Sequence, residues 1–177
     1  MVKIPQEVPD RPEPYNAPVP DPGAAMIHFE GDEAFSLPPA DLFPKLADAG
    51  FLARCLPDAD VVEATPDRAA WKQRPRLSFV SGAIETTLVV ANRVPGEAVA
   101  FTVRGKGVGA TSTVETALTL RRPADGGTVV HWTADITALT GLLKMVPKGL
   151  VQATARAVIG DVWAAVRARI EGEPRQE

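Results

Sequence analysis

The side chains that could do acid–base chemistry are few in this sequence, and they are poorly placed for it. His28 and His131, the two histidines of the chain, both fall on the phase of a predicted strand opposite to its apolar residues. Neither has an acid or a nucleophile at a spacing typical of a catalytic pair, so we expect two surface histidines. Asp32 and Glu33 are adjacent, and adjacent side chains of a strand point to opposite faces, which argues against a paired-carboxylate acid and base.

The sequence also lacks the motifs that hold phosphates, dinucleotides or metal ions. It has no P-loop or HExxH motif, and the glycines of GKGVG at 105–109 lack the strand-to-helix context that dinucleotide binding needs. The single cysteine, Cys55, excludes an intrachain disulfide and a cysteine-rich zinc site, and we expect it to be an apolar filler. We therefore expect a non-enzymatic protein with no catalytic residue, no cofactor and no metal.

Glu33 is the polar residue that most needs an explanation. It lies in phase with Ile27, Phe29 and Phe35, on the predicted inner face of a strand over 26–35. A carboxylate there would have a raised pKa unless a cation or a donor met it. Two interpretations are open: the strand twists and leaves Glu33 in water at the mouth of a cavity, or Glu33 anchors the polar head of a ligand.

Most of the elements that must position these residues are strands. After the strand over 26–35, we predict two short helices, one through Leu46 with Ser36 available as a cap, and one over 49–55. Strands follow at 60–64, 68–80, 83–91 and 98–104, with two more between Thr111 and Ile136 and turns at 94–97, 105–109 and 124–127. Pro75 interrupts the strand over 68–80 and places that point at an edge or a bulge.

A long helix follows the last strand. Pro147 favours either a helix start at that residue or a kink just before the main helix. Apolar residues then recur at three to four residues, and the stripe that should face the sheet is Val146, Leu150, Thr154, Val158, Val162, Val166 and Ile170. The other side of the helix carries Lys148, Gln152, Arg156, Arg167 and Arg169.

Together these elements predict an α+β fold with a curved antiparallel sheet of about seven strands and a long C-terminal helix packed across it. A helix of this length needs a broad concave sheet, which leaves a hollow between the two. The side chains expected to line the hollow and bind a ligand are Phe29, Glu33, Trp71, Phe79, Leu88, Phe101, Leu118, Trp132, Leu150 and Val158. Trp71 and Trp132 could stack on a flat ligand, or they could be ordinary core residues.

Composition limits the domain organisation and the partners. With 177 residues and a 45% hydrophobic share, the chain suits one domain plus an appendage. Seven of the 17 prolines fall within 1–25, so we predict a proline-rich N-terminal arm there, a domain over 26–171 and a short polar tail over 172–177. A net charge of -3 argues against nucleic acid as a partner. The absence of a signal-peptide pattern or a membrane-length apolar run predicts a cytoplasmic protein.

Four segments, together with the order of the elements, resemble the START-like (SRPBCC) superfamily and, within it, the family of the carbon monoxide dehydrogenase G subunit. The segments are FEGDEAFSLPPADLFPKLAD at 29–48, FLARCLPDAD at 51–60, RVPGEAVAFTVRGKGVG at 93–109 and GGTVVHWTAD at 126–135. The likeness covers 26–171 and implies a helix-grip fold. The chain departs from the family at Pro57-Asp58, where Pro-Gly is usual, and at Glu33, where the family tends to place an apolar residue.

Three functions from different classes follow. The favoured one is a non-enzymatic carrier of a hydrophobic small molecule such as a lipid or an isoprenoid quinone. The second, implied by the resemblance, is an accessory or assembly factor of a molybdenum hydroxylase, with 1–25 as a docking arm and Tyr15 and Val19 as its anchors. The third is an enzyme, such as a cyclase or hydrolase, which would need polar groups that converge on the hollow.

Contact with a membrane is a further expectation, with less support. Family relatives are expected to reach the membrane through a tail, whereas the sequence ends at Glu177 just after its helix, so we expect no anchor of that kind. Basic residues near a short apolar segment could touch a membrane or a protein partner, or they could form a solvated helix face. These residues are Lys144, Lys148 and Arg156, beside Leu142, Leu143 and Met145.

Overall fold

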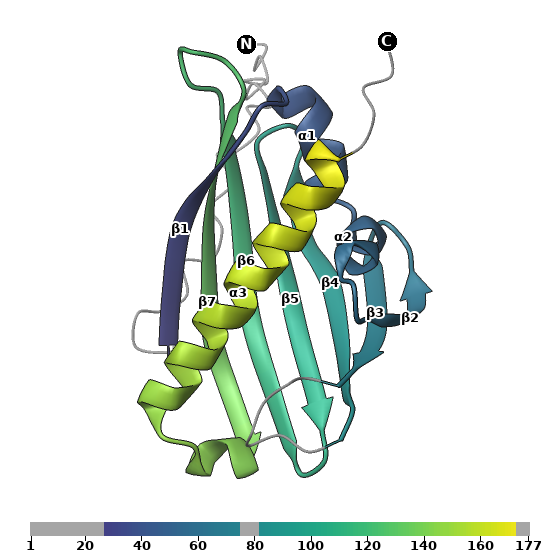
Figure 1. Ribbon diagram of the computed structural model, residues 1–177, viewed down its shortest axis with the longest axis vertical. Helices are drawn as coiled ribbons and strands as arrows, with labels where there is room; N and C mark the ends of the chain where they lie inside the picture. The colour runs from purple at the N-terminus through teal and green to yellow at the C-terminus, as the bar shows by residue number, and fades with distance from the viewer. Residues whose placement is uncertain (1–26, 75–81, 173–177) are drawn as a thin grey trace, which may run out of the picture.

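One antiparallel sheet of seven strands forms the frame of the protein (Figure 1). The computed structural model describes residues 27–74 and 82–172, so the predictions for the arm over 1–25, for Pro75 and for the tail after residue 172 lie outside that range. The strands are β1 (Ile27–Phe35), β2 (Asp60–Ala64), β3 (Arg68–Gln73), β4 (Ile84–Val94), β5 (Ala98–Gly107), β6 (Ala110–Arg121) and β7 (Thr128–Gly141). Their order in the sheet is β1-β7-β6-β5-β4-β3-β2, so the first and last strands of the chain are neighbours.

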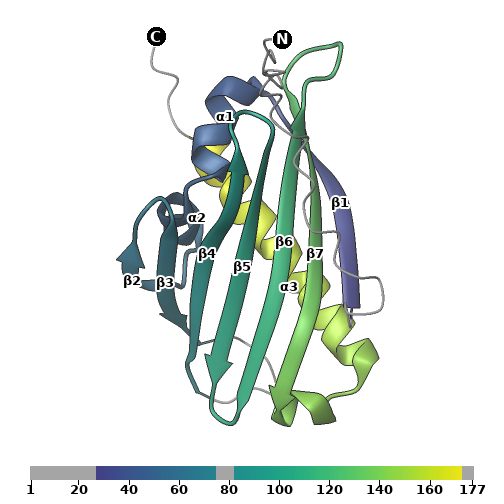
Figure 2. The same ribbon diagram turned by 180° about the vertical axis from the view of Figure 1, so that it is seen from behind.

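The helices all lie on the concave face of this sheet. Helices α1 (Pro39–Leu46) and α2 (Ala49–Cys55) cover one end, and α3 (Lys148–Glu171) crosses the face diagonally after the short 3-10 turn η1 (Leu142–Met145). Figure 2 shows that no described helix covers the opposite face. The predicted fold, with two short helices after the first strand and a long C-terminal helix across a curved sheet, is confirmed.

Local sequence explains most of the helix boundaries. Pro39 occupies the first turn of α1, but Pro38 precedes the helix and no side chain caps it, so the prediction of Ser36 as the cap is wrong. In α2 the cap is Asp48, whose carboxylate accepts a hydrogen bond from the backbone N–H of Phe51 at 3.0 Å. Helix α3 begins directly after Pro147, which confirms the first of the two alternatives for that proline.

Two glycines fix the turn between the sheet and η1. Gly109 ends the β5–β6 hairpin with φ +70°, and Gly141 ends β7 with φ +61°. A Cβ atom added to Gly141 would lie 1.9 Å from the Gly109 carbonyl oxygen, so only glycine fits this close approach of two backbones. The strands also extend beyond the predicted limits, since β7 continues past Ile136 to this glycine.

The predicted apolar stripe on α3 is wrong over the first half of the helix. Leu150 and Val158, which should have faced the sheet, are 44% and 45% exposed. The inner face instead consists of Val151, Ala155, Ile159, Trp163, Val166 and Ile170. An α-helix turns about 100° per residue, so a strict spacing of four residues drifts by about 40° per step and leaves Leu150 about 160° away from Val166.

The interior is divided into two apolar clusters. The larger one lies under α1, α2 and the end of α3, and its most buried members include Leu42, Leu46, Val99, Val130 and Val166. The smaller one lies between β1, β7 and the start of α3, around Ile27, Phe29, Ala134, Ile136 and Leu139. The Trp132 side chain packs against both, so it marks the boundary between the two clusters.

Candidate functional site

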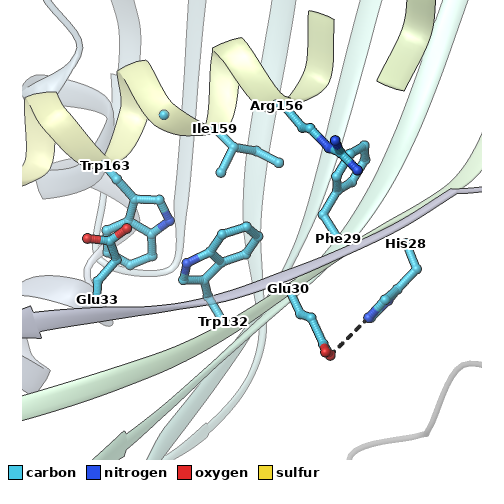
Figure 3. A pocket seen from close by; sticks show the side chains of 9 residues that line it. His28, Phe29, Glu30, Glu33, Trp132, Arg156, Ile159 and Trp163 are labelled. Carbon is cyan, nitrogen blue, oxygen red and sulfur yellow. Dashed lines mark hydrogen bonds and ion pairs between the residues drawn. The ribbon is translucent and has the colours of Figure 1, made fainter. Parts of the chain in front are cut away.

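A pocket of about 500 Å³ lies at this boundary, between β1 and the middle of α3 (Figure 3). Its lining combines apolar rings with charged groups: His28, Phe29, Glu30, Glu33, Trp132, Arg156, Ile159, Gly160 and Trp163. A second pocket of about 550 Å³, beside β2 and β3, is lined mainly by charged and polar groups (Asp58, Asp60, Lys72, Gln73, Arg74 and Ala83). The first pocket is the better candidate for a greasy ligand, because only it combines apolar walls with a position between sheet and helix.

The apolar walls of the first pocket are aromatic. The rings of Trp132 and Trp163 lie with centroids 6.4 Å apart at an interplanar angle of 38°, and Phe35 lies 6.2 Å from Trp163 on the other side. Gly31 sits opposite Trp132 in the β1–β7 pairing, and a Cβ atom there would come within 2.7 Å of the indole Cζ2 atom. The indole therefore lies across a strand position that has no side chain. Among the described residues, the buried Nε1 atom of Trp132 has no hydrogen-bond partner.

Glu33 lies on the pocket side of β1 and is paired with a cation from α3. The Nη2 group of Arg167 donates to Glu33 Oε2 at 2.8 Å, and the Glu33 side chain is 27% exposed. The same guanidinium donates through Nη1 to the Ala34 carbonyl at 2.6 Å and lies 4.5 Å above the Phe35 ring. This places Glu33 at a partly open position, as the first interpretation expected, but its partner is an arginine that the sequence pattern had placed on the outer side of the helix.

The two histidines are on the surface as predicted, but both have acidic partners. His28 Nδ1 lies 2.5 Å from Asp135 Oδ1 and His131 Nδ1 lies 2.9 Å from Asp32 Oδ1. The β1–β7 register causes this, since it pairs His28 with Asp135 and Asp32 with His131. The prediction that neither histidine has an acid nearby is therefore wrong, because residues 107 apart in sequence meet only in the sheet.

The pKa of His28 is raised above its usual value by these contacts. The main cause is the hydrogen bond to Asp135, and the next is the hydrogen bond to Glu30, whose Oε2 lies 3.2 Å from Nε2. Asp135 itself is only 4% exposed. The imidazole at the rim of the pocket is thus stabilised in its protonated form by carboxylates on the outer side of the sheet.

The structure divides the predicted ligand-binding residues into four groups. Phe29, Glu33 and Trp132 line the pocket. Four others, Trp71, Leu88, Phe101 and Leu118, are buried in the larger apolar cluster away from it. Leu150 and Val158 are exposed on the outer side of α3. Phe79 lies outside the described residues.

Several pocket residues were not predicted from the sequence. Ile159 and Trp163 are four residues apart on one side of α3, and the signal that could have identified them is the cluster of large side chains at 159, 163, 166 and 170. Arg156 lies one turn before Ile159, although the sequence pattern had placed it on the solvent side.

In residues 27–74 and 82–172, no group of three or more His, Cys, Asp or Glu side chains is arranged to hold a metal ion. None of the helices within the same ranges is long and apolar enough to span a bilayer.

A family model for the G subunit of carbon monoxide dehydrogenase (CoxG) matches residues 31–171, which is about four fifths of the 177-residue chain. Among curated proteins, none matches this sequence.

Solved structures share the fold at low sequence identity. A conserved protein from Geobacillus kaustophilus superposes with a TM-score of 0.72 at 16% identity, and the match covers 82% of this chain and 96% of that one. A START superfamily protein from Mycobacterium smegmatis gives 0.58 at 10% identity, over 82% of this chain and 97% of that one. The protein Ara h 8.0201 gives 0.57 at 15% identity, over 83% and 99%. Identities this low support the START-like fold and nothing finer.

Proposed function

The chain belongs to the CoxG family of carbon monoxide dehydrogenase, and from that starting point we propose that it binds a hydrophobic small molecule, such as a lipid or a quinone-like compound, in the pocket between β1 and α3. The observation that carries this proposal is the interruption of the core at Trp132. Two apolar clusters that could have merged are separated there by a space of about 500 Å³, within the size range of small-molecule sites.

Burial of the ligand's apolar surface would provide most of the affinity. Each square ångström removed from water contributes about 25 cal/mol. Phe29, Trp132, Ile159 and Trp163 offer the apolar surface, and the charged groups at the rim leave room for a polar end of the ligand. The ligand's polar end would meet Glu33 and Arg167 as an already neutralised pair, so a neutral head group fits this end better than a charged one.

We favour binding over catalysis because the pocket offers no nucleophile. Its lining residues include no serine, threonine, cysteine or lysine, and the carboxylate of Glu33 is already engaged by Arg167. His28 at the rim is likewise engaged by Asp135 and Glu30. A general base held in its protonated form on two carboxylates is poorly suited to accept a proton from a substrate.

Tryptophan fluorescence tests the proposal directly. Trp132 and Trp163 line the pocket, whereas Trp71 lies in the larger cluster away from it. Titration with a ubiquinone analogue or a brominated fatty acid should quench the emission of the natural protein. A Trp71→Phe variant should retain most of this quenching. The double variant Trp132→Phe, Trp163→Phe should show little of it while keeping its affinity in a competition assay.

Native mass spectrometry of protein purified from cells provides a second test. A carrier should retain a co-purified ligand, and an Ile159→Trp variant, which fills the pocket, should lose it. Failure of the natural protein to bind any apolar probe, with the fold intact by circular dichroism, would contradict the proposal.

An accessory role beside a molybdenum hydroxylase is the second candidate, and the family match favours it. This role would rely on protein docking, for which residues 1–25 are the predicted segment. A pull-down that compares the full chain with a variant lacking 1–25 separates the two functions. Loss of the partner with unchanged ligand binding would favour docking through the arm, and the reverse result would favour the carrier.

A further inference from the structure

Three large apolar side chains protrude together at the end of the molecule where α3 begins. Val108 is 73% exposed at the β5–β6 turn, and Leu142 and Met145 are 61% and 81% exposed in η1. The two turns are joined, since the backbone N–H of Leu142 donates to the Gly109 carbonyl at 3.0 Å. Figures 1 and 2 place both turns at the lower end of the sheet, and we refer to Val108, Leu142 and Met145 as the apolar tip.

The apolar tip is held firmly from beneath. Leu143, the neighbour of Leu142, packs on the smaller core cluster together with Val151 from the first turn of α3. The exposed side chains are therefore carried by anchored turns, and they are not the ends of a loosely attached segment. Exposed apolar residues scattered singly need no explanation, but three grouped on one projecting end indicate a contact surface.

The charge around the apolar tip is positive, although the whole chain has a net charge of -3. Lys106, Lys144 and Lys148 are exposed beside it, and the sequence has no carboxylate between Asp135 and Asp161. The carboxylate nearest to these lysines in the sheet pairing is Glu85, opposite Lys106 on β4. Apolar side chains surrounded by lysines match the two layers of an anionic bilayer surface, since the apolar groups enter the acyl boundary and the lysines meet the phosphates.

We propose that the apolar tip is a membrane-docking surface that binds bilayers containing anionic phospholipid. A second copy of this chain fits the surface less well, because two such tips facing each other would bring six lysines together without a compensating charge. The proposal is independent of the pocket, since none of the tip residues or these lysines lines it.

Co-sedimentation with vesicles tests this surface. The full chain should bind vesicles of phosphatidylglycerol and phosphatidylcholine more tightly than vesicles of phosphatidylcholine alone, and added salt should weaken that binding. The double variant Lys144→Ala, Lys148→Ala should lower the partition coefficient about 25-fold, at about five-fold for each lysine. Lys72→Ala with Arg122→Ala removes the same charge elsewhere and should leave binding within about two-fold of the natural protein.

A second pair of variants tests the apolar part. Val108→Glu with Met145→Glu should lower binding to the anionic vesicles by at least about ten-fold. Val62, which is 57% exposed on β2 at the far edge of the sheet, offers the matched control, and Val62→Glu should change binding little. Equal loss in both variants, no binding of the natural protein to either vesicle, or equal binding to both vesicle types would overturn the proposal.

Discussion

Replacement of Gly31 by alanine is the sharpest test of the packing that frames the pocket. The added Cβ atom would lie 2.7 Å from Cζ2, 2.9 Å from Cε2 and 3.0 Å from Nε1 of the Trp132 indole, all closer than ordinary contact. The indole cannot move freely, because it packs against both core clusters and against Trp163. Gly31→Ala should therefore push the ring toward the pocket or bend β1 away from β7.

The magnitude follows from two opposing effects. Overpacking of this kind costs about 1–3 kcal/mol, while removal of a strand glycine recovers about 0.5–1 kcal/mol of backbone entropy. The net result should be a loss of about 1–2 kcal/mol in the free energy of unfolding, or a fall of about 3–6 °C in Tm for a chain of this size. Thermal melting followed by circular dichroism measures the shift, and the tryptophan emission should change with it.

Gly160→Ala provides a matched control with the opposite sign. Gly160 also borders the pocket, but it lies inside α3 and a Cβ atom there meets nothing within 4 Å. Alanine in a helix interior is favoured over glycine by about 1 kcal/mol, so this variant should melt at or above the natural protein. If Gly31→Ala melts as high as Gly160→Ala, the contact between β1 and the indole does not constrain the pocket as argued.

Three further predictions concern charged groups and a turn. Arg167→Ala should lower the free energy of unfolding by about 1–2 kcal/mol in urea titration, and a double-mutant cycle with Glu33→Gln should give a coupling of about 0.5–1 kcal/mol because the pair is partly exposed; additive effects would rule the pairing out. The raised pKa of His28 means that its contribution to stability is fully present below the unfolded pKa and is lost as pH rises through the folded one, so Asp135→Asn should flatten the fall of Tm between about pH 6 and 8, and an NMR titration of His28 that gives no raised pKa would contradict this. Gly141→Ala should cost about 2 kcal/mol or more, since the position has positive φ and no room for a Cβ atom, and a chevron analysis with unchanged stability would contradict the turn geometry.

The elements of the fold could largely be predicted from local sequence. Alternation with period two marked β1 and β7, proline and glycine marked the turns, and Pro147 marked the start of α3. These signals extend over a few residues, and the backbone responds to them locally. The family resemblance then supplied the arrangement of the elements, which the structure confirms.

The phase of α3 shows where local reasoning failed. The sequence offers apolar residues on several sides of this helix, and the stripe through Leu150 and Val158 was as regular as the one through Ile159 and Trp163. Which stripe is buried depends on how the helix rests on the sheet, and the position of the larger cluster at Val166 and Ile170 decides this. The residues of the pocket followed from that choice.

The sequence by itself determined the strands, the helices, the turns and the inward phase of Phe29, Glu33 and Trp132, because each depends on neighbours within about one turn or one hairpin. Only the tertiary structure decided which charges meet. Glu33 and Arg167 are 134 residues apart, and His28 and Asp135 are 107 apart. Their contacts depend on the strand register and on the placement of a helix across the sheet, and neither is encoded at any fixed spacing along the chain.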